Sequence, residues 1–313
     1  MKLSIITINY NNAEGLRKTL ASVASQTYRD IEHIIVDGGS TDGSLEVIKD
    51  YEQAIHHTPY TIHLQWLSEP DHGIYNAMNK GIEIALGHRV VNLDHTSAPN
   101  SLNAKRSTLN ESLCDYIQIL NSGDLLAAPN VTERMMNALY TLHHTPYTEN
   151  ASPAILYGNM IKKDYTTGKI IGKSGEVEYS LRQYFSSTMN HDCCYIRRDI
   201  YEKYGLYDEN LKIVSDWKWF LQTIGLGKVK PVYVDIDVTI FDASGISEMN
   251  LTLRNQERRK VLEELLPPAI LTDYDKYAFP TSQIDRLKKY HLWGLVYFME
   301  RVLFKLNKWG ILR

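Results

Sequence analysis

Cysteine is scarce in this sequence, and the few cysteines form no recognisable pattern. The 313 residues include three of them, Cys114, Cys193 and Cys194. Neither their number nor their spacing suggests a disulfide framework or a zinc site. We therefore expect a reduced, cytosolic compartment.

A strong excess of charge is also missing. The chain has 34 Lys and Arg against 37 Asp and Glu, a formal net charge of −3. Nucleic-acid binding usually requires a strongly basic face, so no nucleic-acid partner is predicted. Hydrophobic residues make up 43% of the chain, which is ample for the core of one large or two smaller domains.

Long hydrophobic runs are absent from the first residues. Residues 1–10, MKLSIITINY, are apolar only briefly and then turn polar. This pattern predicts a strand rather than a signal peptide.

Short apolar runs alternate with stretches of helical spacing through the first half. We expect strands at 3–8, 31–36, 62–67 and 116–120, and helices at 16–24, 44–51, 74–86 and 131–142. Alternation of this kind predicts an α/β fold with a largely parallel, doubly wound sheet. Later in the chain we expect a hairpin (155–161 with 169–172), strands at 191–197 and 232–241, and a helix at 215–224.

Polar residues follow each of the four expected strands of the first half. The ends read TINYNN from Thr7, VDGGSTDGS from Val36, SEPDHG from Ser68 and NSGD from Asn121. In doubly wound sheets, ligands bind at the carboxyl ends of the strands. Four polar ends at one edge therefore indicate a site, although Asp124 alone also suits an ordinary turn.

The glycine-rich stretch at 36–44 matches neither the dinucleotide fingerprint nor a Walker loop. Asp37 at its start could accept hydrogen bonds from a base or a ribose, while the glycines let a ligand approach the backbone. The alternative is a helix-capping loop built on Ser40, Asp42 or Ser44.

Taken together, these motifs resemble the start of a family 2 glycosyltransferase. The match runs from SIITINYNN at Ser4 through EHIIVDGGSTDGS at Glu32 and SEPDHGIYNAMNKG at Ser68 to LNSGD at Leu120. The resemblance covers about residues 1–245 and implies a GT-A fold with a Rossmann-like mixed sheet. It implies a nucleotide-binding half (about 1–130), an acceptor half (about 131–245) and a C-terminal helical extension (246–313).

The resemblance also implies a bound Mg²⁺ or Mn²⁺. Asp124 would be the metal ligand, because hard divalent cations prefer oxygen and often take few carboxylates plus substrate phosphates. Asn121 stands where the family's Asp-x-Asp-like motif has its first acid. An amide can bind a donor hydroxyl but is a weaker metal ligand.

Further donor contacts follow from the resemblance. Thr7, Tyr10 and Asn11 would line the nucleotide pocket, and Asp37 would contact the base or ribose. Two more residues, Asp71 and Asn79, would close the pocket. For these two the alternatives are a helix cap and a surface helix residue.

The general base is expected in the second half, in VSDWKWF at Val214. Asp216 is the candidate, because a helix start favours the carboxylate form that a base needs; its alternative is a helix cap. His191 and Trp217 would face the acceptor or the diphosphate, or else be structural.

The predicted reaction is inverting transfer of a hexosyl or N-acetylhexosaminyl group, with UDP-sugar as the expected donor. The acceptor would be a hydroxyl of a glycan or lipid-linked glycan in cell-envelope polysaccharide assembly. A sugar nucleotidyltransferase would need a glycine-rich, basic loop after the first strand, which 11–15 (NNAEG) lacks. A non-catalytic nucleotide-sugar binding module is the other alternative, suggested by Asn121.

Two segments stand outside the family pattern. Residues 88–113 interrupt it with a long insertion rich in Asn, Ser and Thr. Residues 281–313 carry seven Lys and Arg against two Asp and Glu, interleaved with aromatic and aliphatic residues. This tail either lies in a membrane interface, on the inner face of the membrane, or packs on the protein or on a second copy of it.

Overall fold

The computed structural model describes residues 1–56, 62–91, 114–143, 152–164, 167–177, 179–242, 250–276, 287 and 290–308. Most of the predicted insertion, residues 92–113, lies outside the described residues.

Strands and helices alternate through the first half as predicted. They are β1 (Leu3–Asn9), α1 (Ala13–Ala24), β2 (Ile31–Asp37), α2 (Ser44–His56), β3 (His63–Ser68), α3 (Ile74–Ala85), β4 (Tyr116–Ile119), β5 (Leu125–Leu126) and α4 (Val131–His143).

The second half mixes hairpins and short helices. Its elements are β6 (Ile155–Lys163), β7 (Ile170–Lys173), α5 (Leu181–Ser186), η1 (His191–Cys193), β8 (Cys194–Arg197), α6 (Arg198–Tyr204), α7 (Ser215–Phe220), η2 (Leu221–Gly225), β9 (Pro231–Asp242), α9 (Leu251–Leu265) and α11 (Trp293–Lys308). The predicted hairpin is confirmed, because β6 and β7 pair antiparallel.

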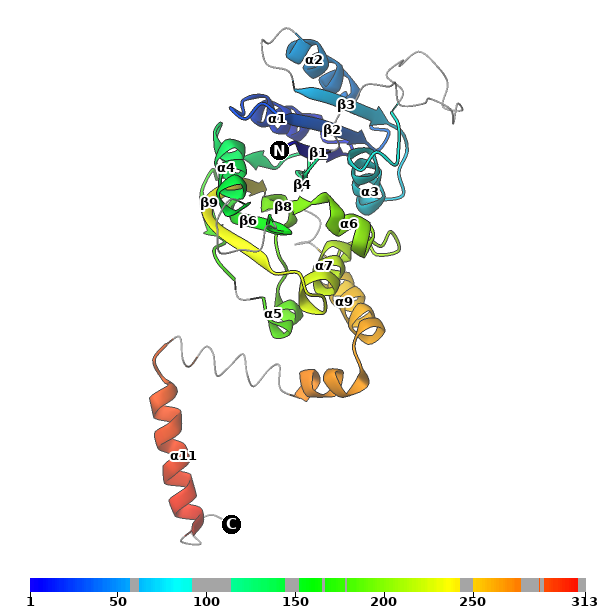
Figure 1. Cartoon of the computed structure of the whole chain (residues 1–313). Coiled ribbons are helices and arrows are strands. Elements are labelled where there is room, and N and C mark those ends of the chain that lie inside the picture. Colours follow the sequence, from blue (N-terminus) through cyan, green and yellow to red (C-terminus); the bar gives the residue numbers. More distant parts are fainter. Residues whose placement is uncertain are drawn as a thin grey trace. The chain divides into compact units, whose positions relative to one another are not determined.

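One mixed sheet connects the two halves (Figure 1). Its strand order is β3-β2-β1-β4-β8-β6-β9-β5, with β7 beside β6. The first four strands run parallel, whereas β8 is antiparallel to both β4 and β6. The mixed α/β sheet confirms the predicted fold class.

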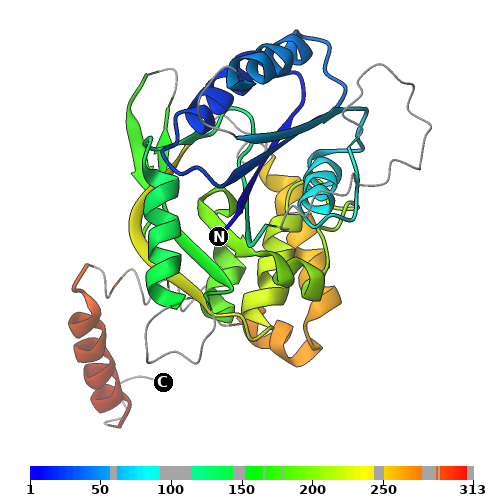
Figure 2. The ribbon, with the colours of Figure 1, turned by 45° about the horizontal axis from the view of Figure 1, so that its top comes forward.

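Strand register decides which helix covers which face. Ile35 belongs to the cluster that α1 and α2 bury, and Ile5 belongs to the cluster that includes α4. Ile6 points the other way, since a Cβ on Gly81 of α3 would lie 2.3 Å from its side chain. Helices α1, α2 and α4 therefore share one face and α3 lies on the opposite one; Figure 2 shows α4 beside β9.

Two predicted elements differ in detail. The strand predicted at 191–197 begins with a 3-10 turn at His191–Cys193, and only Cys194–Arg197 is extended. The helix predicted at 215–224 changes at Leu221 to a wider π-type turn. Apolar periodicity does not distinguish these variants from a regular strand or helix.

The chain divides into two compact units, residues 1–257 and 258–313. Helix α9 spans this boundary. The predicted limits of the catalytic domain, 1–245, and of the C-terminal extension, 246–313, stay a prediction.

Candidate active site

The polar strand ends do meet at one edge of the sheet. Asn9, Asp37 and Ser68, the last residues of three strands, are register partners. Beyond the end of β4, Ser122 N–H donates to the carbonyl of Ile8 at 3.0 Å. Because β8 is antiparallel to β4, the turn at His191 that precedes it lies at the same edge.

Asp37 organises the loop after β2. Its carboxylate accepts from Asn9 Nδ2 at 2.8 Å, from Ser40 N at 3.0 Å and Oγ at 2.6 Å, and from Ser68 Oγ at 2.7 Å. Burial opposes its ionisation, but these hydrogen bonds hold the pKa of Asp37 below its usual value. A carboxylate offers about four acceptor sites, so this one is already satisfied by the protein. The geometry supports loop ordering more directly than ligand contact.

The predicted nucleotide residues separate into buried and exposed groups. Thr7 is fully buried, and its hydroxyl lies 3.0 Å from the core residue His33. Tyr10 is 65% exposed. Asn11 has a positive φ of 47° and accepts from Thr41 N at 2.8 Å, which is a backbone state that asparagine tolerates.

Tyr10 and Asp71 converge on Gly38. A Cβ on Gly38 would lie 2.4 Å from Asp71 Oδ2 and 3.1 Å from Tyr10 Cδ2. An aromatic ring, a carboxylate and bare backbone thus meet at the carboxyl edge of β2. We call this group of Tyr10, Gly38 and Asp71 the cradle.

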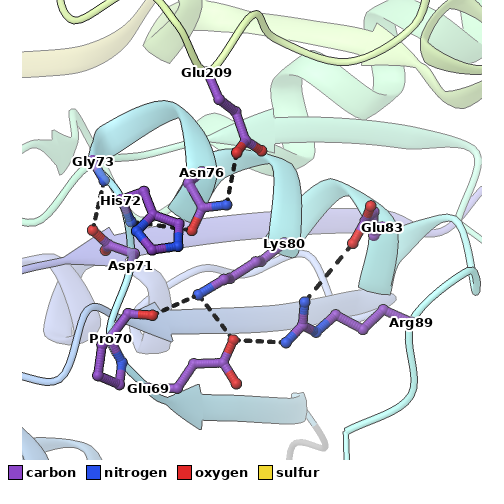
Figure 3. Close-up of polar contacts among 10 residues, drawn as sticks. All are labelled: Glu69, Pro70, Asp71, His72, Gly73, Asn76, Lys80, Glu83, Arg89 and Glu209. Carbon is purple, nitrogen blue, oxygen red and sulfur yellow. Dashed lines mark hydrogen bonds and ion pairs between the residues drawn. The ribbon is translucent and has the colours of Figure 1, made fainter.

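The loop that carries Asp71 is braced by a network of ion pairs (Figure 3). Lys80 of α3, 8% exposed, donates to the carbonyl of Pro70 at 3.1 Å and lies 2.8 Å from Glu69 Oε1. Arg89 contacts the same oxygen at 2.6 Å. Burial opposes ionisation, but Lys80 and Arg89 outweigh it and hold the pKa of Glu69 below normal.

The structure of the turn after β4 bears on both interpretations of Asp124, as an ordinary turn residue and as a residue of a binding site. It is a true turn, since Asp124 N–H donates to the carbonyl of Asn121 at 3.0 Å and Gly123 has a φ of 107°. Yet the Asp124 side chain is buried, at 4% exposure, although turn acids are usually solvated. The turn therefore holds an acid inside the edge where the other polar loops end.

A row of polar side chains runs from this turn to α7. Asn121 Nδ2 lies 3.2 Å from His191 Nε2, and His191 Nδ1 lies 3.4 Å from Asp216 Oδ2. The Tyr75 hydroxyl of α3 donates to Asp216 Oδ1 at 2.9 Å. The buried Oδ1 of Asn121 has no hydrogen-bond partner among the described residues. Tyr75 was missed in the sequence, although it lies in the quoted motif GIYNAMNKG.

These contacts set the ionisation of the row. Burial opposes charge on Asp216, but His191 and then Tyr75 outweigh it, so its pKa lies below normal. Burial likewise opposes charge on His191, but Asp216, then Asp192 and Asp124, raise its pKa above normal. Asp216 is therefore a carboxylate at neutral pH.

Helix α3, which contributes Tyr75 to the row of polar side chains, also contacts the loop at residues 207–209. Asn79 donates to the carbonyl of Tyr207 at 2.9 Å and accepts from its N–H at 2.9 Å. Asn79 and Asn76 also donate to Glu209 at 2.8 and 2.9 Å. The side-chain amide of Asn79 is thus occupied by the 207–209 loop, so Asn79 is not a free surface residue of the helix. Little of its hydrogen-bonding capacity remains for a nucleotide-sugar donor.

The tryptophans of α7 are core residues. Trp217 is 1% exposed and donates to the Tyr184 carbonyl at 2.6 Å. Trp219, also 1% exposed, stacks on Tyr201 with ring centroids 4.8 Å apart. The burial of Trp217 favours its structural alternative over a place in the acceptor site, since a buried ring does not face a sugar.

No metal site is evident from the protein side chains that the structure describes. No group of three or more His, Cys, Asp and Glu side chains in the described residues could hold a metal ion. A metal bound through the Asp124 carboxylate would need a diphosphate to supply most of its remaining oxygen ligands. That division of ligands suits Mg²⁺ and Mn²⁺, which are often held by one or two carboxylates plus substrate phosphates.

Comparison with known sequences finds similarity to glycosyltransferases. Residues 4–99 match the family described as Glycosyl transferase family 2. An uncharacterized glycosyltransferase of Mycobacterium tuberculosis H37Rv is 27% identical over 250 residues, covering 78% of this chain and 76% of that protein. A PGL/p-HBAD biosynthesis glycosyltransferase of Mycobacterium bovis BCG is 23% identical over 247 residues, 77% of each chain.

Solved structures support the GT-A fold. TarS 1–349 of S. aureus in complex with UDP-GlcNAc superposes with a TM-score of 0.55 at 15% identity, covering 86% of this chain and 69% of that one. The UDP complex of TarS is covered over 61% of its length, less than two thirds, with a TM-score of 0.52. A mannosyltransferase of Pyrobaculum calidifontis with GDP-Man and Mn²⁺ gives 0.54 at 14% identity, covering 84% of this chain and 63% of that one.

Proposed function

We propose, from the premise that this chain belongs to glycosyltransferase family 2, that it inverts the anomeric carbon of a nucleotide sugar as it transfers the sugar to a hydroxyl. Glycosyl transfer from a nucleotide sugar is the activity of the family. The inversion, the donor, the acceptor and the residue roles are our proposals.

Asp216 acts as the general base in this proposal. Its carboxylate lies at the start of α7, held by Tyr75 on one oxygen and His191 on the other. Each oxygen keeps a second lone pair to accept a proton. The clamped carboxylate at the edge where the donor loops end is the single observation that carries the proposal.

The chemical step follows from that placement. The acceptor hydroxyl passes its proton to Asp216 while its oxygen forms a bond to the anomeric carbon. The bond from that carbon to the diphosphate oxygen breaks on the opposite side, and the nucleoside diphosphate leaves with the electron pair. Most of the rate enhancement would come from positioning and charge stabilisation.

The nucleotide would occupy the cradle of Tyr10, Gly38 and Asp71. UDP is our expected carrier, supported by the UDP and UDP-GlcNAc complexes of TarS. Asp124 would hold Mg²⁺ or Mn²⁺, and such a metal stabilises the negative charge of the departing diphosphate. Asn121, with its unpartnered Oδ1, would bind a donor hydroxyl.

The acceptor is proposed to be a glycan or lipid-linked glycan of the cell envelope. The printed role of the Mycobacterium bovis relative, PGL/p-HBAD biosynthesis, supports an envelope glycoconjugate. We propose a cytoplasmic location, which suits the three free, buried cysteines.

Calorimetric titration of UDP and GDP, each with and without Mn²⁺, tests the donor site. We expect one nucleotide to bind in a Mn²⁺-dependent manner, and Asp124→Ala to abolish that dependence. Asp50→Ala, which removes an exposed acid of α2, should bind like the wild type. Equal binding by both variants would remove Asp124 from the site.

Transfer is tested next with a panel of sugar nucleotides. Asp216→Asn should bind the donor normally but lose about 10²–10⁴-fold in kcat, the usual contribution of a general base. Donor binding with neither transfer nor hydrolysis by the wild type would instead favour the non-catalytic binding module.

A further inference from the structure

Helix α11 carries an apolar side that is exposed in the part of the chain that the structure describes. Leu295, Phe298, Met299, Val302 and Leu303 follow the i, i+3, i+4, i+7, i+8 spacing that places side chains on one face of a helix. These five side chains are 57%, 63%, 53%, 38% and 50% exposed. Side chains of this kind are usually buried when a helix packs in a core, so this face is available for a partner.

Positive charge flanks that apolar side. Arg301 and Lys305 lie one turn apart, roughly 130° and roughly 90° around the helix from the centre of the apolar residues. Arg301 also lies over the ring of Tyr297, with 6.0 Å from its guanidinium carbon to the ring centroid. Glu300 is the single acid in the sequence of α11.

The C-terminal segment that contains α11 is basic, whereas the rest of the chain is acidic. Residues 281–313 carry seven Lys and Arg against two Asp and Glu, a net charge of +5, whereas the whole chain carries −3. The other 280 residues therefore carry 27 Lys and Arg (34 − 7) against 35 Asp and Glu (37 − 2), a net charge of −8. An anionic surface would attract the tail and repel the rest, so the partner that complements α11 by charge is anionic.

The helix does not span a bilayer. No helix among the described residues is long and apolar enough to cross a membrane. The 16 residues of α11 extend about 24 Å, less than the roughly 30 Å hydrocarbon core. An amphipathic helix with aromatic residues and a cationic flank instead suits the plane of the interface.

We propose that α11 lies in the surface of an anionic lipid bilayer. Its Leu295–Leu303 side enters the acyl boundary, and Arg301 and Lys305 reach the headgroups, because long basic side chains extend along an apolar surface to keep their charge in water. This attachment would hold the enzyme at the membrane where a lipid-linked acceptor resides. It does not depend on the proposed transfer reaction.

Flotation of the full chain with vesicles tests the proposal. We expect binding to phosphatidylcholine vesicles that contain phosphatidylglycerol and much weaker binding to phosphatidylcholine alone. Added salt should weaken binding to the anionic vesicles, because it screens exposed charges.

Two double variants separate the contributions of the apolar and cationic sides. Arg301→Gln with Lys305→Gln should weaken binding about 30-fold, since each cation near an anionic surface is worth about fivefold. Phe298→Ser with Leu303→Ser should abolish it. The matched control, Ile170→Ser with Ile171→Ser, removes two apolar side chains of β7 that are 67% and 55% exposed and should change nothing.

Equal binding by all three variants, or no binding by the wild type, would overturn the proposal. So would a dimer, seen by light scattering without vesicles, that Phe298→Ser with Leu303→Ser dissociates, because the face would then belong to a second copy. Transfer to a soluble acceptor should survive in both α11 variants. That assay distinguishes failure of this proposal from failure of the proposed function.

Discussion

Removal of one hydroxyl group from Tyr75 should shift the pH dependence of the reaction. Tyr75→Phe deletes the hydroxyl that donates to Asp216 Oδ1 at 2.9 Å. It keeps the aromatic ring, whose centroid lies 5.7 Å from that of the Tyr207 ring. The hydroxyl stabilises the carboxylate form, so its loss should raise the pKa of Asp216. A higher pH is then needed to form the base.

The size of the shift follows from the hydrogen bond. A hydrogen bond to a charged group contributes about 1.5–3 kcal/mol, which corresponds to about 1–2 pKa units. Asp216 keeps its contact with His191, and its side chain is 16% exposed, so water can replace part of the lost bond. We therefore expect the acidic limb of kcat/KM to move up by about one unit. Above that limb the base is ionised, but it has lost the hydrogen bond that positions it. We therefore expect kcat to fall about tenfold there, less than the full contribution of a base, with the donor KM unchanged.

Tyr207→Phe is the matched control. Tyr207 is also buried, at 4% exposure, but its hydroxyl pairs with the Tyr201 hydroxyl at 3.3 Å instead of with Asp216. Its pH profile should keep the wild-type limb. If the two variants share one profile, or if Tyr75→Phe leaves the limb in place, then Tyr75 does not position the base.

Three further predictions concern the nucleotide cradle, its brace and the buried histidine. Gly38→Ala would place a methyl 2.4 Å from Asp71 Oδ2 and should weaken nucleotide binding at least about tenfold by calorimetry; Gly175→Ala, with nothing within 4 Å, should bind as the wild type does. Lys80→Met leaves the brace without its buried cation and should lower the free energy of unfolding in urea by about 1–3 kcal/mol; an unchanged midpoint would show that the brace is not stabilising. The folded-state pKa of His191 is raised, so its contribution to stability is complete below its ordinary value of 6.5 and is lost as pH rises through the folded value. The stability difference between wild type and His191→Gln should therefore shrink as pH rises above 6.5, and a difference that grows would contradict the assigned shift.

Local patterns were enough to place most of the regular structure. The strands at 3–9, 31–37 and 63–68 and the helices between them lie within a few residues of their predicted limits. Apolar periodicity and capping residues are properties of neighbouring positions, so they can be read without knowing the fold. The polar strand ends and the acid at the start of α7 were visible for the same reason.

The roles of individual side chains were harder to predict, because they depend on burial. Asp37 looked like a ligand contact, and the structure surrounds it with four protein donors. Trp217 was expected to face the acceptor or the diphosphate, or else to be structural, and it is 1% exposed. A residue type shows what a side chain can bind, but only the packing around it shows what it does bind.

The sequence by itself therefore determined the order of the elements, the polar edge of the sheet and the acids placed there. Only the tertiary structure decided that Tyr75 and Asp216, 141 residues apart, share a hydrogen bond, and that His191 joins Asp216 to Asn121. The reason is that these contacts depend on the order in which β4, β8 and β6 pair and on the face of the sheet that α3 covers. Neither is encoded in the spacing of neighbouring residues, because both are settled by how the whole chain buries its apolar surface.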